Sequence, residues 1–206
     1  DPVTSSGFNG IFLVATNPVD IMTRITCTLS GFNPRRVLGT GTALDTARLR
    51  YLLGEYLKVD PRNIHAYVMG EHGDTEFVPW SQAMVATKSI TELCEESHGS
   101  ICAQELEQIS EEVRTAAYKI IEAKNATYYG IGMALTRITK AILGNEHSVL
   151  TVSAMLRGEY GQSGIFTGVP CIINQNGVQR VLPLSLSEEE SEKLEQSCQI
   201  LKRSYE

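Results

Sequence analysis

One histidine in this sequence is especially well placed for proton transfer. His72 lies in the segment 70–74 (GEHGD), which follows the strand-like run 64–69. The two glycines of the segment allow the backbone to turn sharply, so the imidazole can project into a cleft instead of packing in a core. The ordinary pKa of histidine, about 6.5, allows it to exchange a proton near neutrality. A solvated turn histidine has the same pattern, so this segment alone leaves both interpretations open.

An acidic and a basic residue lie three positions apart near the start of an expected helix, residues 43–57. Asp45 and Arg48 therefore share one face of that helix. The carboxylate could hold one ring nitrogen of His72, and the guanidinium could bind the carboxylate of a small substrate through two hydrogen bonds. A surface ion pair has the same spacing and is the alternative. Arg50 lies about 200° around the helix from Arg48 and must serve a different surface.

An asparagine follows the most apolar run of the chain. Residues 11–15 are typical of a strand buried on both faces in a parallel sheet, and Asn17 begins the segment NPVD at 17–20. Ligands collect at the carboxyl ends of strands in open α/β sheets, so the Asn17 amide could bond a cofactor or a substrate. A simple Asx turn before Pro18 would also explain the segment.

The elements that must position these residues alternate between strand and helix over the first seventy residues, as in an α/β protein. A second short strand is expected at 37–41. The second half predicts a long amphipathic helix at 109–143, or two helices in series, with a bend at 124–127. It also predicts a strand at 148–156, a hairpin turning at 174–177, and a last helix that starts at Ser187 with a capping box to Glu190.

The composition of the 206 residues, 42% hydrophobic and 20% charged, is that of an ordinary soluble globular protein. A formal net charge of −6 argues against nucleic acid as a partner, and the longest apolar run is far too short to cross a membrane. The cysteines are odd in number and scattered, which predicts reduced thiols in a cytoplasmic protein and no metal site. They are Cys27, Cys94, Cys102, Cys171 and Cys198.

Four segments follow one another along the chain: ATNPVD at 15–20, GTALDTARLR at 41–50, HAYVMGEHGDTE at 65–76 and AYKIIEAKNATYYGIGMAL at 117–135. In this order and spacing they resemble the L-lactate and malate dehydrogenase family, and most of all its bacterial L-lactate dehydrogenases. The resemblance implies that His72 is the proton donor to the substrate ketone. It also implies that Asp45 orients and stabilises the imidazolium, and that Arg48 binds the substrate carboxylate.

The resemblance further implies a hydride from NADH and a pocket shared with the cofactor. Asn17 would contact the substrate oxygen and hold the nicotinamide end of the cofactor. Thr127 would line the substrate pocket, and Ile131, one helical turn further on, would pack on the nicotinamide. Glu71 and Thr127 favour pyruvate and lactate as substrates, and a malate or other 2-hydroxy acid dehydrogenase is the nearest alternative. The choice between NAD and NADP stays open because the residue that reads the ribose lies upstream of Asp1.

Regulation and assembly are expected from the same resemblance. Arg50 and His65 match the positions at which bacterial relatives often bind fructose 1,6-bisphosphate between subunits, and a cationic side chain at position 50 suits a phosphate. The family resemblance also implies a homotetramer.

The implied fold is α/β, in two parts. Residues 1–40 would be the C-terminal remnant of a Rossmann NAD-binding domain, and residues 41–206 the α+β substrate domain that carries the catalytic residues. The Gly-rich turn and the mobile loop of the family lie outside this sequence, so the 206 residues by themselves are expected to be inactive. A third interpretation, from a different class of function, is an inactive module that keeps the subunit-contact and effector surfaces.

Overall fold

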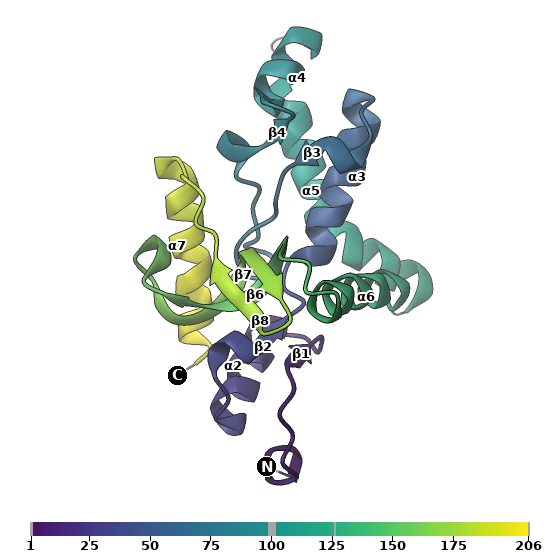
Figure 1. Cartoon of the computed structure of the whole chain (residues 1–206). Coiled ribbons are helices and arrows are strands. Elements are labelled where there is room, and N and C mark those ends of the chain that lie inside the picture. Colours follow the sequence, from purple (N-terminus) through teal and green to yellow (C-terminus); the bar gives the residue numbers. More distant parts are fainter. Residues whose placement is uncertain (1, 99–101, 126, 206) are drawn as a thin grey trace.

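The computed structural model describes residues 2–98, 102–125 and 127–205. Within them, five strands form one mixed sheet in the order β1-β2-β6-β7-β8 (Figure 1). The strands β1 and β2 are parallel, and every other neighbouring pair of this sheet is antiparallel. Their bounds are β1 Phe12–Val14, β2 Val37–Gly39, β6 Ser148–Arg157, β7 Ser163–Asn174 and β8 Gly177–Val181.

A smaller sheet and the longer helices complete the fold. The small sheet has the order β3-β4-β5, with bounds Ile64–His65, Met84–Val85 and Lys88–Ser89. The α-helices are α1 Pro2–Ser5, α2 Val19–Ser30, α3 Ala43–Leu57, α4 Ile90–His98, α5 Cys102–Lys124, α6 Tyr129–Leu143 and α7 Glu188–Arg203. Short 3-10 turns occur at Pro34–Arg36, Pro61–Asn63, Trp80–Gln82 and Glu159–Gly161.

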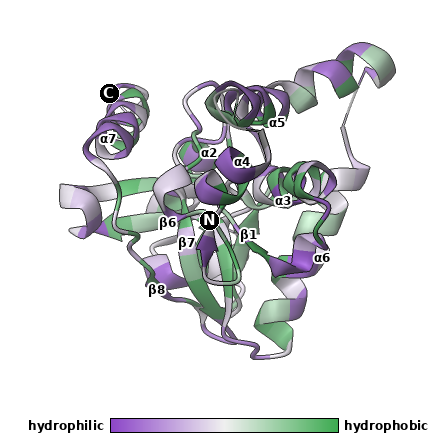
Figure 2. Cartoon of the chain, turned by 90° about the horizontal axis from the view of Figure 1, so that it is seen from above, coloured by the Kyte–Doolittle hydropathy of each residue, from purple (hydrophilic) through white to green (hydrophobic). Residues whose placement is uncertain are grey.

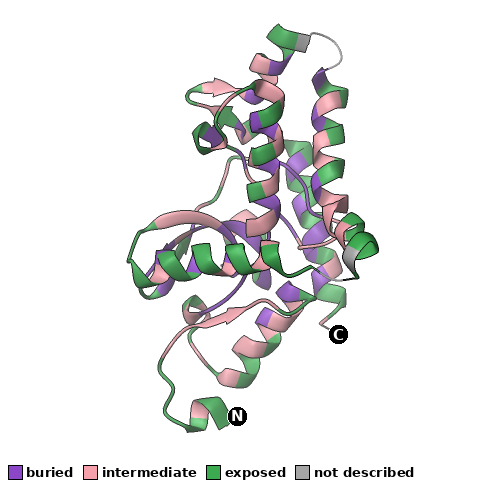
Figure 3. Ribbon diagram, turned by 90° about the vertical axis from the view of Figure 1, so that its right-hand side faces the viewer, coloured by how far each residue is buried: buried purple, intermediate pink, exposed green. Residues whose placement is uncertain are grey.

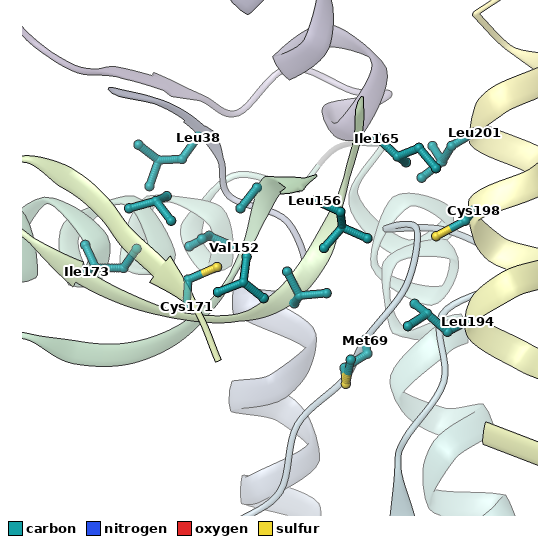
Figure 4. Packing of buried hydrophobic residues seen from close by; sticks show 14 of the residues in the cluster. Leu38, Met69, Val152, Leu156, Ile165, Cys171, Ile173, Leu194, Cys198 and Leu201 are labelled. Atoms are coloured by element: carbon teal, nitrogen blue, oxygen red, sulfur yellow. The ribbon is translucent and has the colours of Figure 1, made fainter. Parts of the chain in front are cut away.

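Two hydrophobic clusters hold these elements together. The first lies on the large sheet and under α7, and Figure 4 shows Val152, Leu156 and Leu194 among its members. The second joins α3 to the small sheet, α4 and α5, with Leu49 and Leu53 fully buried at its centre. In Figure 2 the strands of the large sheet carry much of the green of hydrophobic residues, whereas α7 is largely purple.

Several predicted elements are confirmed. The helix expected at 43–57 is α3, and the hairpin expected around residues 174–177 joins β7 to β8. At the start of α7, the Ser187 hydroxyl accepts a hydrogen bond from the backbone N–H of Glu190, and the Glu190 carboxylate accepts one from the N–H of Ser187. Each of these signals is local in sequence, which is why the pattern of residues identifies it.

Three other predictions are wrong in their detail. The segment 109–143 forms two helices in series, as one of its two interpretations predicted, but the expected bend is a stop: α5 ends at Lys124, Asn125 takes a left-handed φ of 61°, and α6 starts at Tyr129. The predicted strand 64–69 pairs as a strand only at Ile64–His65, and its last residue, Met69, forms an isolated bridge to Phe77. The run 11–15 is half-buried and not buried on both faces, because β1 is the edge strand of the described sheet.

The expectation that all five cysteines are reduced is also wrong. The structure joins Cys94 of α4 to Cys102 at the start of α5 by a disulfide, with their Cα atoms 5.4 Å apart. The packing of α4 beside α5 brings the two thiols together, which their scattered sequence positions do not reveal. Cys27, Cys171 and Cys198 are free.

Figures 1 and 3 show the N-terminal segment with α1 extending away from the rest of the molecule, and its residues are mostly exposed.

Among the described helices, none combines the length and apolar character needed to span a membrane.

Candidate active site

The turn that carries His72 is anchored first to the large sheet. The backbone N–H of Gly70 donates to the carbonyl of Gly168 on β7 at 2.9 Å, and the reverse bond is 2.8 Å. Gly70 has a φ of +98°, and a Cβ at this position would lie 2.8 Å from the Ser197 hydroxyl oxygen. Only glycine adopts this conformation without strain at such a close approach. The glycine before the Glu-His pair therefore sets the direction in which the turn leaves the sheet.

Helix α7 supplies a second anchor for the same turn. The Ser197 hydroxyl accepts a hydrogen bond from the backbone N–H of Glu71 at 2.7 Å. The Thr75 hydroxyl donates to the Glu71 carboxylate at 2.5 Å, which closes the turn on itself. These bonds fix the backbone on both sides of His72.

The first turn of α3 is tied to the strand that leads into this segment. The Thr42 hydroxyl donates to the carbonyl of Val68 at 2.7 Å, and the Val68 N–H donates to the Thr46 hydroxyl at 2.9 Å. Because Asp45 lies between these two threonines on the helix, the pair of bonds sets its position relative to His72. The two threonine hydroxyls therefore help to place Asp45 beside His72.

The three residues predicted to carry the chemistry form one contiguous group. The Nδ1 of His72 lies 2.8 Å from Oδ2 of Asp45, and the Nη1 of Arg48 lies 3.1 Å from Oδ1 of the same carboxylate. The side chain of Asp45 is 3% exposed, whereas those of His72 and Arg48 are 25% and 20% exposed. The carboxylate is therefore buried beneath an imidazole and a guanidinium that both reach toward the surface.

Electrostatics keep the imidazole protonated. Burial by itself lowers the pKa of His72, but the neighbouring carboxylates of Asp45 and Glu76 outweigh it and raise the pKa to about 10. A protonated imidazole whose Nδ1 faces a carboxylate presents its Nε2–H as an acid. The arrangement can deliver a proton to an oxygen atom placed beside a group that Arg48 holds.

Glu76 is a second carboxylate at the imidazole that the sequence analysis missed. Its Oε2 lies 3.8 Å from Nδ1 of His72, and its side chain is 5% exposed. Burial raises the pKa of the Glu76 carboxyl, and the nearby charge of Asp45 raises it further. Glu76 also lines a cavity of about 240 Å³ between the segment 74–80, α5 and α7. Its spacing of four residues from His72 is the only sequence signal that would have pointed to it.

Asp20 is a second missed residue, although its segment was identified. Its side chain lies in the first turn of α2 and accepts a hydrogen bond from the backbone N–H of His72 at 2.8 Å. Asn17, at the carboxyl end of β1, is exposed, and its peptide bond to Pro18 is cis. The bond made by Asp20 attaches the segment that carries Asn17 to the turn that carries His72.

Thr127 and Ile131 lie just before and within the first turn of α6. Gly130, between Thr127 and Ile131, packs against α3: a Cβ there would lie 3.1 Å from Cδ2 of Leu44 and 3.8 Å from Nη2 of Arg48. Ile131 is half-buried and Thr127 is exposed. The start of α6 is therefore beside the guanidinium proposed to bind substrate, and a small residue at position 130 permits this approach.

Arg50 and His65 lie on a different surface from the catalytic group. The Nε of Arg50 donates to the carbonyl of Ala66 at 3.0 Å, and its guanidinium lies 5.0 Å above the ring of Tyr67. His65 is exposed on β3 and immediately precedes Ala66. The two residues are thus brought into the same neighbourhood, and burial lowers the pKa of Arg50.

Asp45, His72 and Glu76 are also residue types that can bind a metal ion. One donor atom from each lies within 4.8 Å of the others. The short distance from Nδ1 of His72 to Asp45 is accounted for by an imidazolium beside a carboxylate, which needs no cation. The close approach of Asp45 to His72 is the one expected from the sequence, and Glu76 is an additional carboxylate beside them.

Sequence comparisons match the chain to a family over most of its length. A model of the lactate/malate dehydrogenase alpha/beta C-terminal domain matches residues 42–206. The chain is 54% identical over 200 residues to an L-lactate dehydrogenase 2 of Bacillus cereus, covering 97% of this chain and 63% of that protein. It is 52% identical over 204 residues to an L-lactate dehydrogenase of Oceanobacillus iheyensis, again covering 63% of that protein.

Solved structures agree with the sequence matches. The minor L-lactate dehydrogenase of Enterococcus mundtii in its ligands-bound form superposes with a TM-score of 0.91 at 50% identity, covering 98% of this chain and 64% of that one. A lactate dehydrogenase enzyme from a Medee basin deep-sea metagenome library gives a TM-score of 0.94 at 48% identity, with the same coverage. The chain spans less than two thirds of the length of these relatives, and it belongs to the lactate/malate dehydrogenase family.

Proposed function

We propose that the chain is the C-terminal part of an NAD-dependent L-lactate dehydrogenase, which interconverts pyruvate and L-lactate. The contact that carries the proposal is the 2.8 Å approach of Asp45 to Nδ1 of His72, with Arg48 bound to the same carboxylate. Pyruvate has one carboxylate for a guanidinium and one ketone for an imidazolium. The identity to bacterial L-lactate dehydrogenases supports this choice of substrate.

When bound, NADH would supply a hydride, two electrons with one proton, to the ketone carbon of pyruvate, and the loss of its own C–H bond would leave NAD⁺. His72 gives the proton from Nε2 to the ketone oxygen and becomes neutral, so a new C–H and a new O–H bond replace the C=O π bond. Asp45 keeps its negative charge throughout and stabilises the imidazolium before the transfer. Arg48 holds the substrate carboxylate through two parallel hydrogen bonds, which fixes the ketone beside the acid.

The described residues fit the nicotinamide end of the cofactor. Asn17 is exposed beyond the carboxyl end of β1, where cofactors bind in sheets of this kind, and Ile131 is half-buried in the first turn of α6. We propose that these two residues hold the nicotinamide ring and that Thr127 lines the substrate pocket. Residues 1–40 would then be the remnant of the NAD-binding domain, and 41–206 the substrate domain.

The anion site proposed at Arg50 and His65 is separate from catalysis. Arg50 is held by Ala66, next to His65, and points away from the carboxylate that binds Arg48. We propose that this surface takes the phosphates of fructose 1,6-bisphosphate between subunits of a homotetramer in the cytoplasm. Pyruvate saturation curves with and without the bisphosphate test the site, and identical curves would remove it.

The substrate is tested in a fusion enzyme, in which the N-terminal part of the Bacillus cereus L-lactate dehydrogenase 2 precedes the present chain. We expect NADH oxidation with pyruvate at a kcat/KM well above that with oxaloacetate. A preference for oxaloacetate would establish a malate dehydrogenase instead. NADH titration of the 206-residue chain alone tests the inactive-module alternative, and micromolar binding with turnover would contradict the expectation that the chain is inactive by itself.

A further inference from the structure

The buried carboxylate of Asp20 bridges three separate segments of the fold. Its side chain is 2% exposed. Oδ2 accepts from the backbone N–H of His72 at 2.8 Å, and Oδ1 accepts from the hydroxyl of Ser153 on β6 at 2.5 Å. One side chain therefore connects α2, the catalytic turn and the large sheet.

Burial of a carboxylate is unfavourable unless hydrogen bonds compensate for the lost contact with water. Burial raises the pKa of Asp20 to about 6, and the bonds from Ser153 and His72 oppose that rise. The first turn of a helix favours a negative charge, as does the nearby imidazolium of His72. An ionised carboxylate only accepts hydrogen bonds, so both donors must remain in place for the site to be satisfied.

Successive residues of the catalytic turn have different anchors. Gly168 holds Gly70, and Ser197 holds Glu71. Asp20 accepts its hydrogen bond from the backbone N–H of His72 itself. A loss of this bond would leave the two outer anchors intact while releasing the backbone of the proton donor.

We propose that Asp20 is a positioning residue of the active site, which fixes the backbone of His72 and joins it to the segment of Asn17. The proton donor and the amide at the nicotinamide side would thereby keep a constant spacing during turnover. The inference rests on the proposed function for its kinetic consequence, and on the contacts alone for its structural consequence. Asp20 touches neither substrate nor cofactor and acts only through the residues that it holds.

Three variants of the fusion enzyme separate positioning from folding. In Asp20→Asn the amide oxygen can accept from His72 while the amide N–H donates to Ser153, whose hydroxyl can also accept. In Asp20→Ala both donors lose their partner. The control is Thr23→Val on the same helix, because Thr23 is fully buried and its hydroxyl bonds only the carbonyl of Val19 at 2.6 Å among the contacts described.

We expect Asp20→Ala to lower kcat by about 100-fold, the effect of a displaced catalytic group, with the KM for NADH changed by no more than about threefold. The kcat of Asp20→Asn should be at least about tenfold higher than that of Asp20→Ala, and the kcat of Thr23→Val should lie within about twofold of the parent's. If Asp20→Ala does not fold, Asp20→Ser replaces it, because the shorter side chain cannot span both donors. An unchanged kcat in a folded Ala or Ser variant, or an Asn variant as slow as Ala, would overturn the proposal.

A second measurement does not depend on any dehydrogenase activity. In the ¹⁵N-labelled 206-residue chain, Asp20→Ala should shift the backbone amide and both ring nitrogen signals of His72, whereas Thr23→Val should leave them in place. His72 signals that do not respond to Asp20→Ala would overturn the inference. If the fusion enzyme reduces no 2-oxo acid, the proposed function fails while this measurement still decides the role of Asp20.

Discussion

The Nδ1 of His72 lies 2.8 Å from Oδ2 of Asp45, and the two residues come from different parts of the chain, the turn between β3 and β4 and the first turn of α3. The contact fixes which ring nitrogen faces the carboxylate and leaves Nε2 free for a substrate. Because Asp45 is almost fully buried, its charge acts on the imidazole with little screening by water. The consequences of this contact for rate and stability can be measured.

Replacement of Arg48 by lysine tests the binding of the substrate carboxylate. Lysine keeps the positive charge but loses the two parallel donors, so kcat/KM for pyruvate should fall by about 100-fold in the fusion enzyme. The matched control is Arg62→Lys, because Arg62 forms an exposed ion pair with Asp60 away from the catalytic group. Steady-state kinetics of both variants give the comparison, and equal effects at the two positions would contradict the assignment of Arg48.

The dependence of stability on pH tests the environment of His72. Its pKa is about 10 in the folded chain against 6.5 for the unperturbed group, so the folded state binds the proton more tightly. The resulting stabilisation is fully present below pH 6.5 and is lost as the pH rises toward 10. In urea unfolding between pH 6.5 and pH 10, the free energy of unfolding of the parent should decline with rising pH, whereas that of His72→Asn should not. Parallel curves would contradict the raised pKa.

Removal of the charge at Glu76 tests its influence on the proton donor. Glu76→Gln keeps the size of the side chain but removes one of the two carboxylates that raise the pKa of His72. The alkaline limb of kcat/KM for pyruvate should therefore move to lower pH, by about one unit, while the rate near neutrality changes little. An unchanged limb would show that Glu76 does not act on the imidazole.

The parts of the structure that were predictable are those with local signals. The helix 43–57, the 174–177 hairpin and the Ser187 cap each depend on residues a few positions apart. Asp45 and Arg48 were identified for the same reason, since they lie within one helical turn. Their meeting with His72 required the family resemblance, because nothing local links the helix to the turn.

The residues that were missed have distant or ambiguous partners. Asp20 and His72 are 52 positions apart, and no pattern of residue types connects a helix carboxylate with a backbone N–H in a remote turn. Glu76 lies close in sequence, but its burial depends on packing between α5 and α7. The Cys94–Cys102 disulfide was missed because cysteine counting speaks to cellular compartment and not to the packing of α4 on α5.

Chelation tests the assignment of Asp45, His72 and Glu76 to proton transfer. Extended dialysis of the fusion enzyme against EDTA should leave pyruvate reduction unchanged, because the ion pair of His72 with Asp45 needs no cation. The matching measurement is the metal content of the purified protein before dialysis. A loss of activity that zinc or manganese restores would contradict the assignment.

In the proposed reaction, His72 donates the proton during reduction of pyruvate. The most direct test is the kcat of the His72→Asn fusion enzyme with pyruvate, together with its affinity for NADH. We expect kcat to fall by about 100-fold to 10,000-fold, the usual contribution of a general acid, with the affinity for NADH nearly unchanged. A variant that keeps a kcat close to that of the parent would contradict the role of His72.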